Sequence, residues 1–246
     1  MKTSGNTILI TGGGTGIGAG LAKAFHDRGN RVIVAGRTAA SLQATVAGND
    51  GMTALELDVT SDASVARAVE QLARDYPDLN VVIHSAGIMS RDELTGGGLD
   101  LMRQVIDTNL IGTIRLVEAL VPQLSGKPGA TICTVTSGLA FAPLPSAPAY
   151  SASKAAVHSY TLSLRHRLQG QVDVVEIAPP AVRTGLTPGQ ETREGYMPLE
   201  DYIAETMANF ESDPALRENL VRNVLPLRTA EADGRMDAML DLLGSL

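Results

Sequence analysis

The chain has little of several residue types that mark particular classes of protein. Tryptophan is absent, phenylalanine and tyrosine number three and five, and Cys133 is the only cysteine. One cysteine cannot form a disulfide within the chain, which favours a reducing compartment such as the cytoplasm. Few aromatic rings and a net charge of −7 argue against a surface that binds nucleic acid. No apolar run reaches the roughly 18 residues needed to span a membrane, and the N-terminus lacks the apolar core of a signal peptide.

Short apolar runs alternate with longer amphipathic segments over most of the 246 residues. The runs predicted to be strands are residues 7–11, 31–36, 52–58, 80–87, 130–137 and 172–179. The segments predicted to be helices are residues 16–30, 61–76, 99–124 and 149–168. Because apolar strands separated by helices form parallel sheets covered on both faces, the pattern predicts a single α/β domain over residues 1–246.

A glycine-rich turn follows the first predicted strand and opens the first predicted helix. It reads TGGGTGIG over residues 11–18, with Gly12, Gly16 and Gly18 in a G-x-x-x-G-x-G spacing. Because glycine has no Cβ, the backbone can approach a pyrophosphate, whose charge meets the unpaired N–H groups at the start of the helix. A merely flexible turn is the alternative, but the strand–turn–helix setting favours dinucleotide binding.

The end of the second predicted strand, AGRT, indicates which dinucleotide is bound. Sites for NAD commonly hold the ribose hydroxyl with a carboxylate about 20 residues beyond the glycines. Gly36 takes that place here, and Arg37 follows it. An arginine can pair with a 2′-phosphate that a carboxylate would repel, and Thr15 and Thr38 offer hydroxyl donors. The sequence therefore predicts NADP(H) in preference to NAD(H), against the alternative that Arg37 is a solvated charge.

Tyr150 and Lys154 lie four residues apart in the run AYSASKAAV, which places them on one face of the last predicted helix. The pKa of a tyrosine is ordinarily near 10, so proton exchange near pH 7 needs about 4 kcal/mol of stabilisation of the phenolate. An exposed ion pair at this spacing supplies only about 0.5 kcal/mol. If Tyr150 is an acid–base group, Lys154 must be sheltered from water and helped by a positively charged cofactor ring.

Ser137 at the end of the fifth predicted strand and Asn109 in the long helical segment complete a set with Tyr150 and Lys154. This set resembles the catalytic tetrad of the short-chain dehydrogenase/reductase family. The glycine turn, Asp58, SAG at residues 85–87 and PPAVRT at residues 179–184 match the same family. The resemblance implies a doubly wound Rossmann fold of six strands in the order 3-2-1-4-5-6, and NADP(H)-dependent interconversion of a carbonyl and a secondary alcohol.

The resemblance also implies roles for individual residues. Tyr150 is the general acid and base, Lys154 holds the nicotinamide ribose, Ser137 hydrogen-bonds the substrate oxygen, and Asn109 carries a water that links Lys154 to solvent. Asp58 meets the adenine, Gly87 approaches the nucleotide and Thr184 touches the carboxamide. The complete set of predicted cofactor-binding residues is Gly12, Gly14, Thr15, Gly16, Ile17, Gly18, Arg37, Thr38, Asp58, Val59, Ala86, Gly87, Tyr150, Lys154, Pro179, Val182 and Thr184.

The segment over residues 184–210 is predicted to form a lid within the domain. Its first part, TGLTPGQETREGYMPL, is rich in glycine, proline and polar residues and follows a parallel strand. An inert surface loop is the alternative. The expected substrate pocket lies between this lid, residues 88–91, Leu139, Phe141 and residues 143–148. Most of these walls are apolar, which favours a lipophilic carbonyl or alcohol as the small-molecule substrate.

The chain also departs from the family pattern. His84 and Ser85 stand where two asparagines are common, and we expect His84 to be a buried strand-end group bonded to backbone, without a chemical role. His158 and His166 are expected to pack, and no histidine or cysteine spacing indicates a metal site. Residues 220–246 are predicted to be helical, with packing residues Leu220, Val224, Leu240 and Leu243. This tail resembles the DltE-type subgroup, and the family resemblance implies a homo-oligomer, a dimer through the two longest helices.

Two other functions are consistent with a dinucleotide fold. A catalytically idle nucleotide-binding sensor or partner protein would typically lack the tyrosine or the lysine, and this chain has both. An enzyme that epimerises or dehydrates nucleotide sugars would typically be longer, with a substantial substrate domain.

Overall fold

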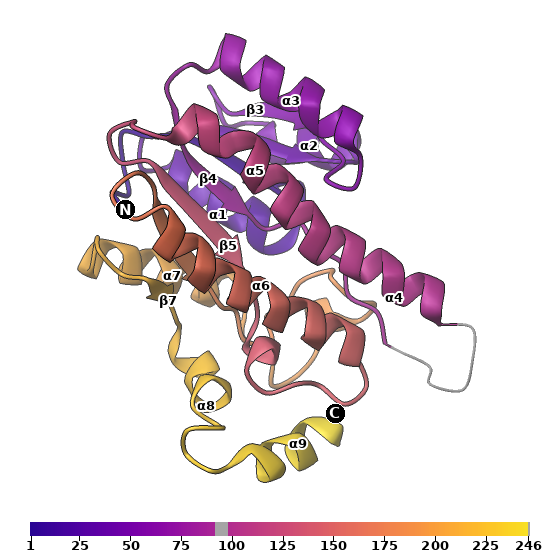
Figure 1. Ribbon diagram of the computed structural model, residues 1–246. Coiled ribbons are helices and arrows are strands. Elements are labelled where there is room, and N and C mark those ends of the chain that lie inside the picture. The colour runs from indigo at the N-terminus through magenta and orange to yellow at the C-terminus, as the bar shows by residue number, and fades with distance from the viewer. Residues whose placement is uncertain (92–97, 246) are drawn as a thin grey trace.

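A seven-stranded parallel sheet forms the centre of the computed structural model, which describes residues 1–91 and 98–245 (Figure 1). The strands are β1 (Thr7–Thr11), β2 (Arg31–Gly36), β3 (Thr53–Glu56), β4 (Leu79–His84), β5 (Thr131–Val135), β6 (Asp173–Ile177) and β7 (Glu218–Asn219). They lie in the order β3-β2-β1-β4-β5-β6-β7. The direction of winding reverses between β1 and β4, and ligands of such sheets bind outside the carboxyl ends of the strands at that point.

The sheet has seven strands where the sequence predicted six. The additional strand, β7, consists of Glu218 and Asn219, which pair in parallel with Glu176 and Ile177 of β6. Two residues contain neither an alternation nor an apolar run, so hydrophobic periodicity cannot detect such a strand. The predicted order of the first six strands is confirmed.

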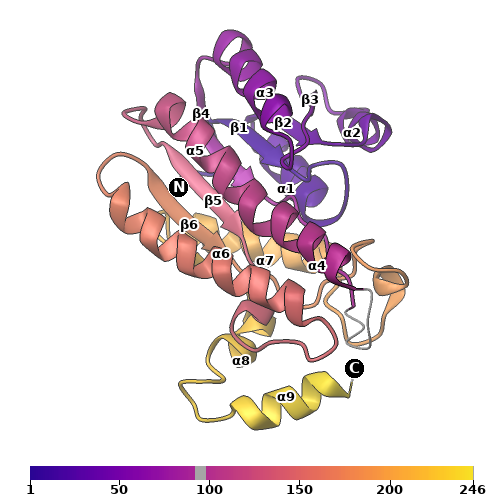
Figure 2. The ribbon, with the colours of Figure 1, turned by 45° about the vertical axis from the view of Figure 1, so that its right-hand side comes forward.

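Helices cover both faces of the sheet (Figures 1 and 2). The helices that pack on one face are α1 (Gly16–His26), α2 (Ala39–Val46) and α7 (Leu199–Ser212). Those on the other face are α3 (Asp62–Asp75), α5 (Gly112–Leu124) and α6 (Pro148–Arg167). Successive strand residues divide between two hydrophobic cores, with Ile8 and Ile10 in the first and Leu9 in the second. Side chains of a strand alternate in direction, so an all-apolar strand such as β1 serves both cores.

The long segment predicted as one helix over residues 99–124 contains a local irregularity. It comprises α4 (Leu99–Ile106), a π-helical turn η1 (Asp107–Ile111) and α5, without a break. A π-helical turn is an α-helical turn widened by one extra residue, and such turns are frequent at functional sites. Helix α2 was not predicted, because it buries only Leu42 and therefore has no apolar stripe.

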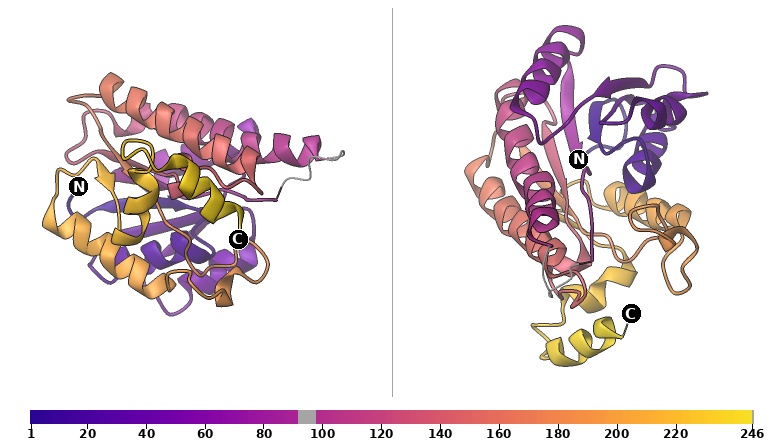
Figure 3. Two further views of the ribbon diagram at one scale, coloured as in Figure 1. Left: turned by 90° about the horizontal axis from the view of Figure 1, so that it is seen from below. Right: turned by 90° about the vertical axis from the view of Figure 1, so that its right-hand side faces the viewer.

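The C-terminal part of the chain lies across the end of the molecule (Figure 3). It contains a 3₁₀ turn η4 (Arg222–Val224), α8 (Leu225–Arg228) and α9 (Met236–Gly244), so the predicted helical tail is confirmed. Val224 and Leu243 are buried, whereas Leu220 and Leu240 are partly buried. None of the helices in the described part of the chain is long and apolar enough to cross a lipid bilayer.

Candidate active site

The turn between β1 and α1 presses its glycines against neighbouring backbone. Gly12 has a φ of 65°, and a Cβ there would lie 2.9 Å from the Ala86 nitrogen and the Ser85 oxygen at the end of β4. A Cβ on Gly18 would lie 2.2 Å from the Gly12 oxygen. Both positions therefore accept only glycine. The tight turn leaves the N–H groups at the start of α1 facing a cavity, where they can bind an anion.

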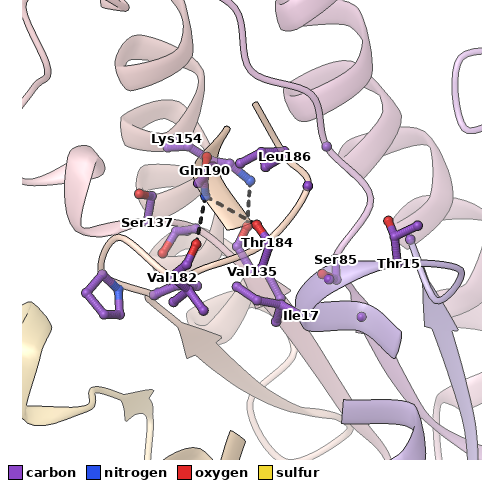
Figure 4. Close-up of a pocket in the computed structure, with 18 of the residues that line it drawn as sticks. Thr15, Ile17, Ser85, Val135, Ser137, Lys154, Val182, Thr184, Leu186 and Gln190 are labelled. Carbon is purple, nitrogen blue, oxygen red and sulfur yellow. Dashed lines mark hydrogen bonds between the residues drawn. The ribbon is translucent and has the colours of Figure 1, made fainter. Parts of the chain in front are cut away.

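A cavity of about 150 Å³ runs from this turn to the ends of β5 and α6 (Figure 4). Figure 4 shows Thr15 and Ile17 on one side of it and Ser137 and Lys154 on the other. The predicted site residues that line this cavity are Gly12, Thr15, Gly16, Ile17, Gly18, Gly87, Ser137, Tyr150, Lys154, Pro179, Val182 and Thr184. The structure thus brings the glycine turn and three of the four tetrad residues to one cavity.

A second cavity, of about 190 Å³, adjoins the first at the ends of β2 and β3. The two cavities share Gly12, Thr15 and Gly87 as lining residues. The remaining predicted cofactor residues line the second cavity: Gly14, Arg37, Thr38, Asp58, Val59 and Ala86. Every residue predicted to bind the cofactor therefore lines one of the two cavities, which together cross the topological switch point of the sheet.

The second cavity has an arginine on its rim and a carboxylate in its wall. Arg37 is exposed just after β2. Asp58 accepts hydrogen bonds from the Thr60 nitrogen at 3.0 Å and the Thr60 hydroxyl at 2.7 Å. The backbone bond from Thr60, then its hydroxyl, and more weakly the charges of Arg37 and Arg115 hold the pKa of Asp58 below its usual value. The carboxylate is therefore an acceptor at neutral pH.

Ser137, Tyr150 and Lys154 meet at the carboxyl end of β5. Ser137 is in extended backbone at the end of the strand, and its side chain lies close enough to the Tyr150 phenol to lower the pKa of that phenol. Tyr150 and Lys154 are both in α6, and their exposed fractions are 6% and 5%. The Lys154 Nζ donates to the Val135 oxygen at 2.8 Å and lies 5.7 Å from the centroid of the Tyr150 ring. Lys154 is thus sheltered from water, as an acid–base role for Tyr150 requires.

Burial, and not the lysine, dominates the proton affinity of the phenol. It raises the pKa of Tyr150 to about 12, against a smaller lowering by the hydrogen bond with Ser137. Burial also lowers the pKa of Lys154 to about 8. The sequence argument predicted that Lys154, together with a positive cofactor ring, biases Tyr150 toward the phenolate. In the protein alone the shift has the opposite sign, because burial disfavours the charged phenolate.

Asn109 lies in the π-helical turn η1 and lines neither cavity. Its Oδ1 accepts from the Ile88 nitrogen at 2.8 Å, and its Nδ2 donates to the Ile88 oxygen at 2.9 Å and the Ser153 hydroxyl at 3.0 Å. A Cβ added to Gly87 would lie 3.2 Å from Asn109 Oδ1 and 3.5 Å from Lys154 Nζ. Asn109 therefore fixes the backbone at Ile88, and its Oδ1 lies on the same side of Gly87 as the Lys154 ammonium.

The second part of the predicted lid belongs to α7, which packs in the first core. The first part is anchored over the glycine turn by a residue that the sequence analysis missed. Gln190, in the 3₁₀ turn η3 (Gln190–Thr192), donates to the Val182 oxygen at 2.8 Å and to the Thr184 hydroxyl at 3.2 Å (Figure 4). Thr184 in turn lies 3.3 Å from where a Cβ on Gly16 would be. Gln190 lines the first cavity and is buried, but nothing in its local sequence distinguishes it from other polar loop residues.

The sequence predicted that His84 is bonded to backbone, but in the structure its ring is bonded to a side chain. Its Nδ1 lies 2.8 Å from the Thr11 hydroxyl, which also accepts from the Ala86 nitrogen at 3.2 Å. Burial, then the charge of Lys154, lowers the pKa of His84 to about 3, so the ring is neutral at physiological pH. The Thr11 hydroxyl at the end of β1 therefore binds both His84, the last residue of β4, and the turn that follows it.

His158 packs as predicted, within a polar cluster that the sequence analysis did not foresee. Its Nδ1 lies 2.7 Å from Oε2 of Glu176, which is fully buried and also accepts from the Thr136 hydroxyl at 2.6 Å. The ligand atoms of His158, Glu176 and Glu218 lie within 4.8 Å of one another. Arg228 already pairs with Glu218, so the cluster balances its charges with protein groups.

A third cavity, of about 110 Å³, opens from Ser137 and Tyr150 on the side away from the glycine turn. Of the predicted substrate walls, Met89, Arg91, Leu139 and Leu144 line it, together with Leu186 and other residues of the lid. Phe141 does not, because its ring packs against His158, with centroids 4.8 Å apart. Leu227 and Leu243 line it without having been predicted, since the C-terminal segment returns to the site only in the folded chain.

Comparisons with known proteins agree with this geometry. A family model for the short chain dehydrogenases matches residues 6–195. The uncharacterised oxidoreductase DltE of Bacillus subtilis strain 168 is 39% identical over 198 residues, which cover 79% of each protein. An uncharacterised oxidoreductase of Staphylococcus aureus strain MW2 is 32% identical over 182 residues, which cover 73% of this chain and 79% of that protein. The resemblance seen in the sequence is confirmed.

Solved structures of the same kind superpose over almost the whole chain. A short chain dehydrogenase from Burkholderia cenocepacia J2315 in complex with NADP has a TM-score of 0.83 and 26% identity, and the match covers 98% of this chain and 99% of that one. A short chain dehydrogenase/reductase from Burkholderia phymatum in complex with NAD has a TM-score of 0.83 and 21% identity, with 96% of both chains covered. At 21% identity, the match to the Burkholderia phymatum structure shows a shared fold and nothing more.

Proposed function

Because the chain belongs to the short-chain dehydrogenase family, we propose that it is an NADP(H)-dependent oxidoreductase that interconverts a carbonyl and a secondary alcohol. One observation carries the proposal. Ser137, Tyr150 and Lys154 line the same cavity as the glycine turn. A site for a pyrophosphate and an acid–base group thus share one space, which is what hydride transfer coupled to proton transfer requires.

The residues present fit a nicotinamide dinucleotide. At Gly12, Gly14 and Gly18 a Cβ would lie within 3.0 Å of neighbouring atoms, so the turn presents bare backbone to a phosphate. In this proposal Asp58 and Val59 bind the adenine end, Lys154 and Tyr150 the nicotinamide ribose, and Thr184 the carboxamide. Bound there, the cofactor supplies or accepts the hydride.

Tyr150 is the proton donor in the reducing direction. With a pKa of about 12 the phenol is protonated at neutral pH, so the acid is in place before the reaction begins. The Ser137 hydroxyl, which lines the same cavity, donates its one proton to the substrate oxygen as negative charge develops there. Lys154, buried and 5.7 Å from the phenol ring, stabilises the phenolate that forms when the proton leaves. In the oxidising direction Tyr150 must first lose its proton, and the same ammonium favours that loss.

The function is tested by following the absorbance of NADPH with a panel of ketones and aldehydes. Consumption that depends on both the protein and the carbonyl compound supports the proposal. If the protein binds NADPH tightly but consumes none with any compound of the panel, it is the idle nucleotide-binding sensor instead.

Arg37 is the basis for proposing NADP(H) over NAD(H). It lines the second cavity next to Gly36, where a carboxylate would repel the 2′-phosphate. A charge-assisted bond to phosphate contributes about 1.5–3 kcal/mol, so Arg37→Ala should raise the KM for NADPH at least about 10-fold and leave that for NADH unchanged. Lys23→Ala, which removes an exposed cation near the other end of α1, is the control. A wild-type protein that prefers NADH would contradict the assignment.

We also propose that the protein is a cytoplasmic homodimer. The outer face of the helices over β4 and β5 exposes Ile111 of η1 and Leu162 of α6, whose exposed fractions are 40% and 45%. The proposal rests on the family resemblance, which implies a dimer through the two longest helices, and both side chains lie on those helical segments. The lone, buried Cys133 suits a reducing compartment. Light scattering after size exclusion should give twice the chain mass of 25.7 kDa, whereas a monomer at micromolar concentration would contradict the dimer.

A further inference from the structure

The substrate cavity has a wall that comes from the last part of the chain. Leu227 of α8 and Leu243 of α9 line the cavity that Ser137 and Tyr150 also line. Both leucines lie beyond residues 6–195, the part that the family model matches. This wall therefore belongs to residues 222–244, here termed the C-terminal segment, which lies across the end of the molecule in Figure 3.

The C-terminal segment touches the residue that follows the catalytic serine. A Cβ on Gly138 would lie 2.5 Å from Leu227 Cδ1 and 2.9 Å from Val224 Cγ2. The φ of Gly138 is not positive, so the backbone conformation does not require glycine there. The glycine is needed for space, because a Cβ at residue 138 would force the side chains of Val224 and Leu227 to shift.

The second helix of the segment packs on the catalytic tyrosine. Met239 and Leu243 of α9, both 8% exposed, belong to the same hydrophobic cluster as Leu144, Ala147 and Tyr150. Leu139 and Leu227 pack against that cluster as partly buried members. The end of the cavity beside Tyr150 is therefore apolar and is shared between the loop after β5 and the C-terminal segment.

A chain of polar and aromatic contacts holds the segment in this position. The guanidinium of Arg228 lies 4.7 Å above the Phe141 ring and donates to both carboxylate oxygens of Glu218, at 3.2 and 3.3 Å. The Phe141 ring meets His158 edge-on, and His158 is bonded to the buried Glu176. Contacts on both sides of Arg228 thus fix α8, and with it the neighbouring Leu227.

We propose that Leu227 and Leu243 are specificity-determining residues that select carbonyl substrates with an uncharged apolar substituent. With its carbonyl at Ser137 and Tyr150, such a substrate places the substituent against Leu139, Leu144, Leu227 and Leu243. Arg91 and Arg193 also line the cavity, but a charged group placed against the four leucines would lose its hydration without gaining a partner from them. The inference rests on the proposed oxidoreductase function and adds the substrate class to it.

The chain offers matched variants for the test. Leu227→Ala and Leu243→Ala shorten the side chains that line the cavity. Leu225→Ala and Leu242→Ala make the same change at neighbouring positions that are 42% and 57% exposed. The probes are 2-alkanones of increasing chain length, with pyruvate as a small charged ketone, and NADPH as reductant. A methylene in an apolar pocket changes kcat/KM by about 10-fold or more, so chain length is a sensitive readout.

We expect kcat/KM of the wild type to rise along the alkanone series up to a best length, and pyruvate to be reduced far more slowly. Leu227→Ala and Leu243→Ala should move the best length up by about one to three carbons, because each removes three carbons from the wall. Leu243→Phe, which fills the cavity, should move it down. The two exposed controls should leave it unchanged.

Some results would refute the proposed substrate selectivity and leave the proposed oxidoreductase function intact. Preference for pyruvate over alkanones of similar size would do so, as would equal shifts in the cavity variants and the exposed controls. Ligand-observed NMR of the same ketones with the NADP⁺-loaded protein separates the two proposals. Binding that follows the same length order without turnover refutes the oxidoreductase function and leaves the wall's selectivity standing. Alkanones that neither bind nor react refute the selectivity.

Discussion

Replacing Lys154 by methionine tests whether a charged lysine is buried in the site. The side chain is 5% exposed, and burial lowers its pKa from 10.5 to about 8. A shift of this size means that keeping the ammonium in the folded protein costs about 3 kcal/mol wherever both states are protonated. Between pH 8 and 10.5 the unfolded chain binds the proton and the folded protein has released it, so Lys154 makes stability rise with pH in that window. Methionine carries no charge and keeps most of the apolar stem.

We expect the difference in the free energy of unfolding between the wild type and Lys154→Met to change with pH. From pH 7 to pH 10, the free energy of unfolding of the wild type should gain roughly 2–3 kcal/mol relative to Lys154→Met, because the cost of burying the ammonium disappears. Urea unfolding at each pH measures this, and taking the difference cancels the titration of all other groups. Lys23→Met, at an exposed position, should show no such trend. A Lys154→Met difference that stays constant from pH 7 to 10 would refute the reasoning.

Two further predictions concern buried groups outside the cavity. Burial raises the pKa of the Cys133 thiol to about 12, so the native protein should resist Ellman's reagent at pH 8 and react fully in urea; rapid reaction of the folded protein would be inconsistent with this burial. Glu176→Ala should cost about 3 kcal/mol in urea unfolding, since it strips the partner from the Thr136 hydroxyl and His158. Glu211→Ala, which breaks the surface pair with Arg28, should cost under about 1 kcal/mol. If both variants lose the same free energy of unfolding, the buried Glu176 contributes no more stability than a surface ion pair.

The sequence predicted most of the sheet because parallel strands buried on both faces are continuous apolar runs. Strands such as β1, whose five residues are all buried, are unmistakable in composition. Helix α7 was missed although it buries Tyr202, Met207 and Phe210, because its residues were assigned to the lid. Two other missed elements lack this signal. Helix α2 buries one side chain, and β7 is two residues long and held by its pairing with β6. Such elements are fixed by tertiary contacts that local patterns do not contain.

The site was predictable where its residues belong to a motif of fixed spacing. The glycine turn and the Tyr150–Lys154 pair are local, and their strand and helix carry them to the same edge of the sheet. Gln190, Leu227 and Leu243 are not part of such a motif, and they reach the site because loops and the C-terminal segment fold back over it. The rise in the Tyr150 pKa in the protein alone could not be predicted either, because spacing does not reveal how deeply the phenol is buried.

The most direct test of the account is the rate of NADPH oxidation by Tyr150→Phe with a ketone that the wild type reduces. Phenylalanine keeps the ring, which is buried beside Leu144 and Ala147, and removes only the hydroxyl that exchanges the proton. We expect turnover to fall by at least about 100-fold, the contribution of a general acid, while the affinity for NADPH stays within about threefold. A variant that reduces the ketone at close to the wild-type rate would contradict the role of Tyr150 and the mechanism built on it.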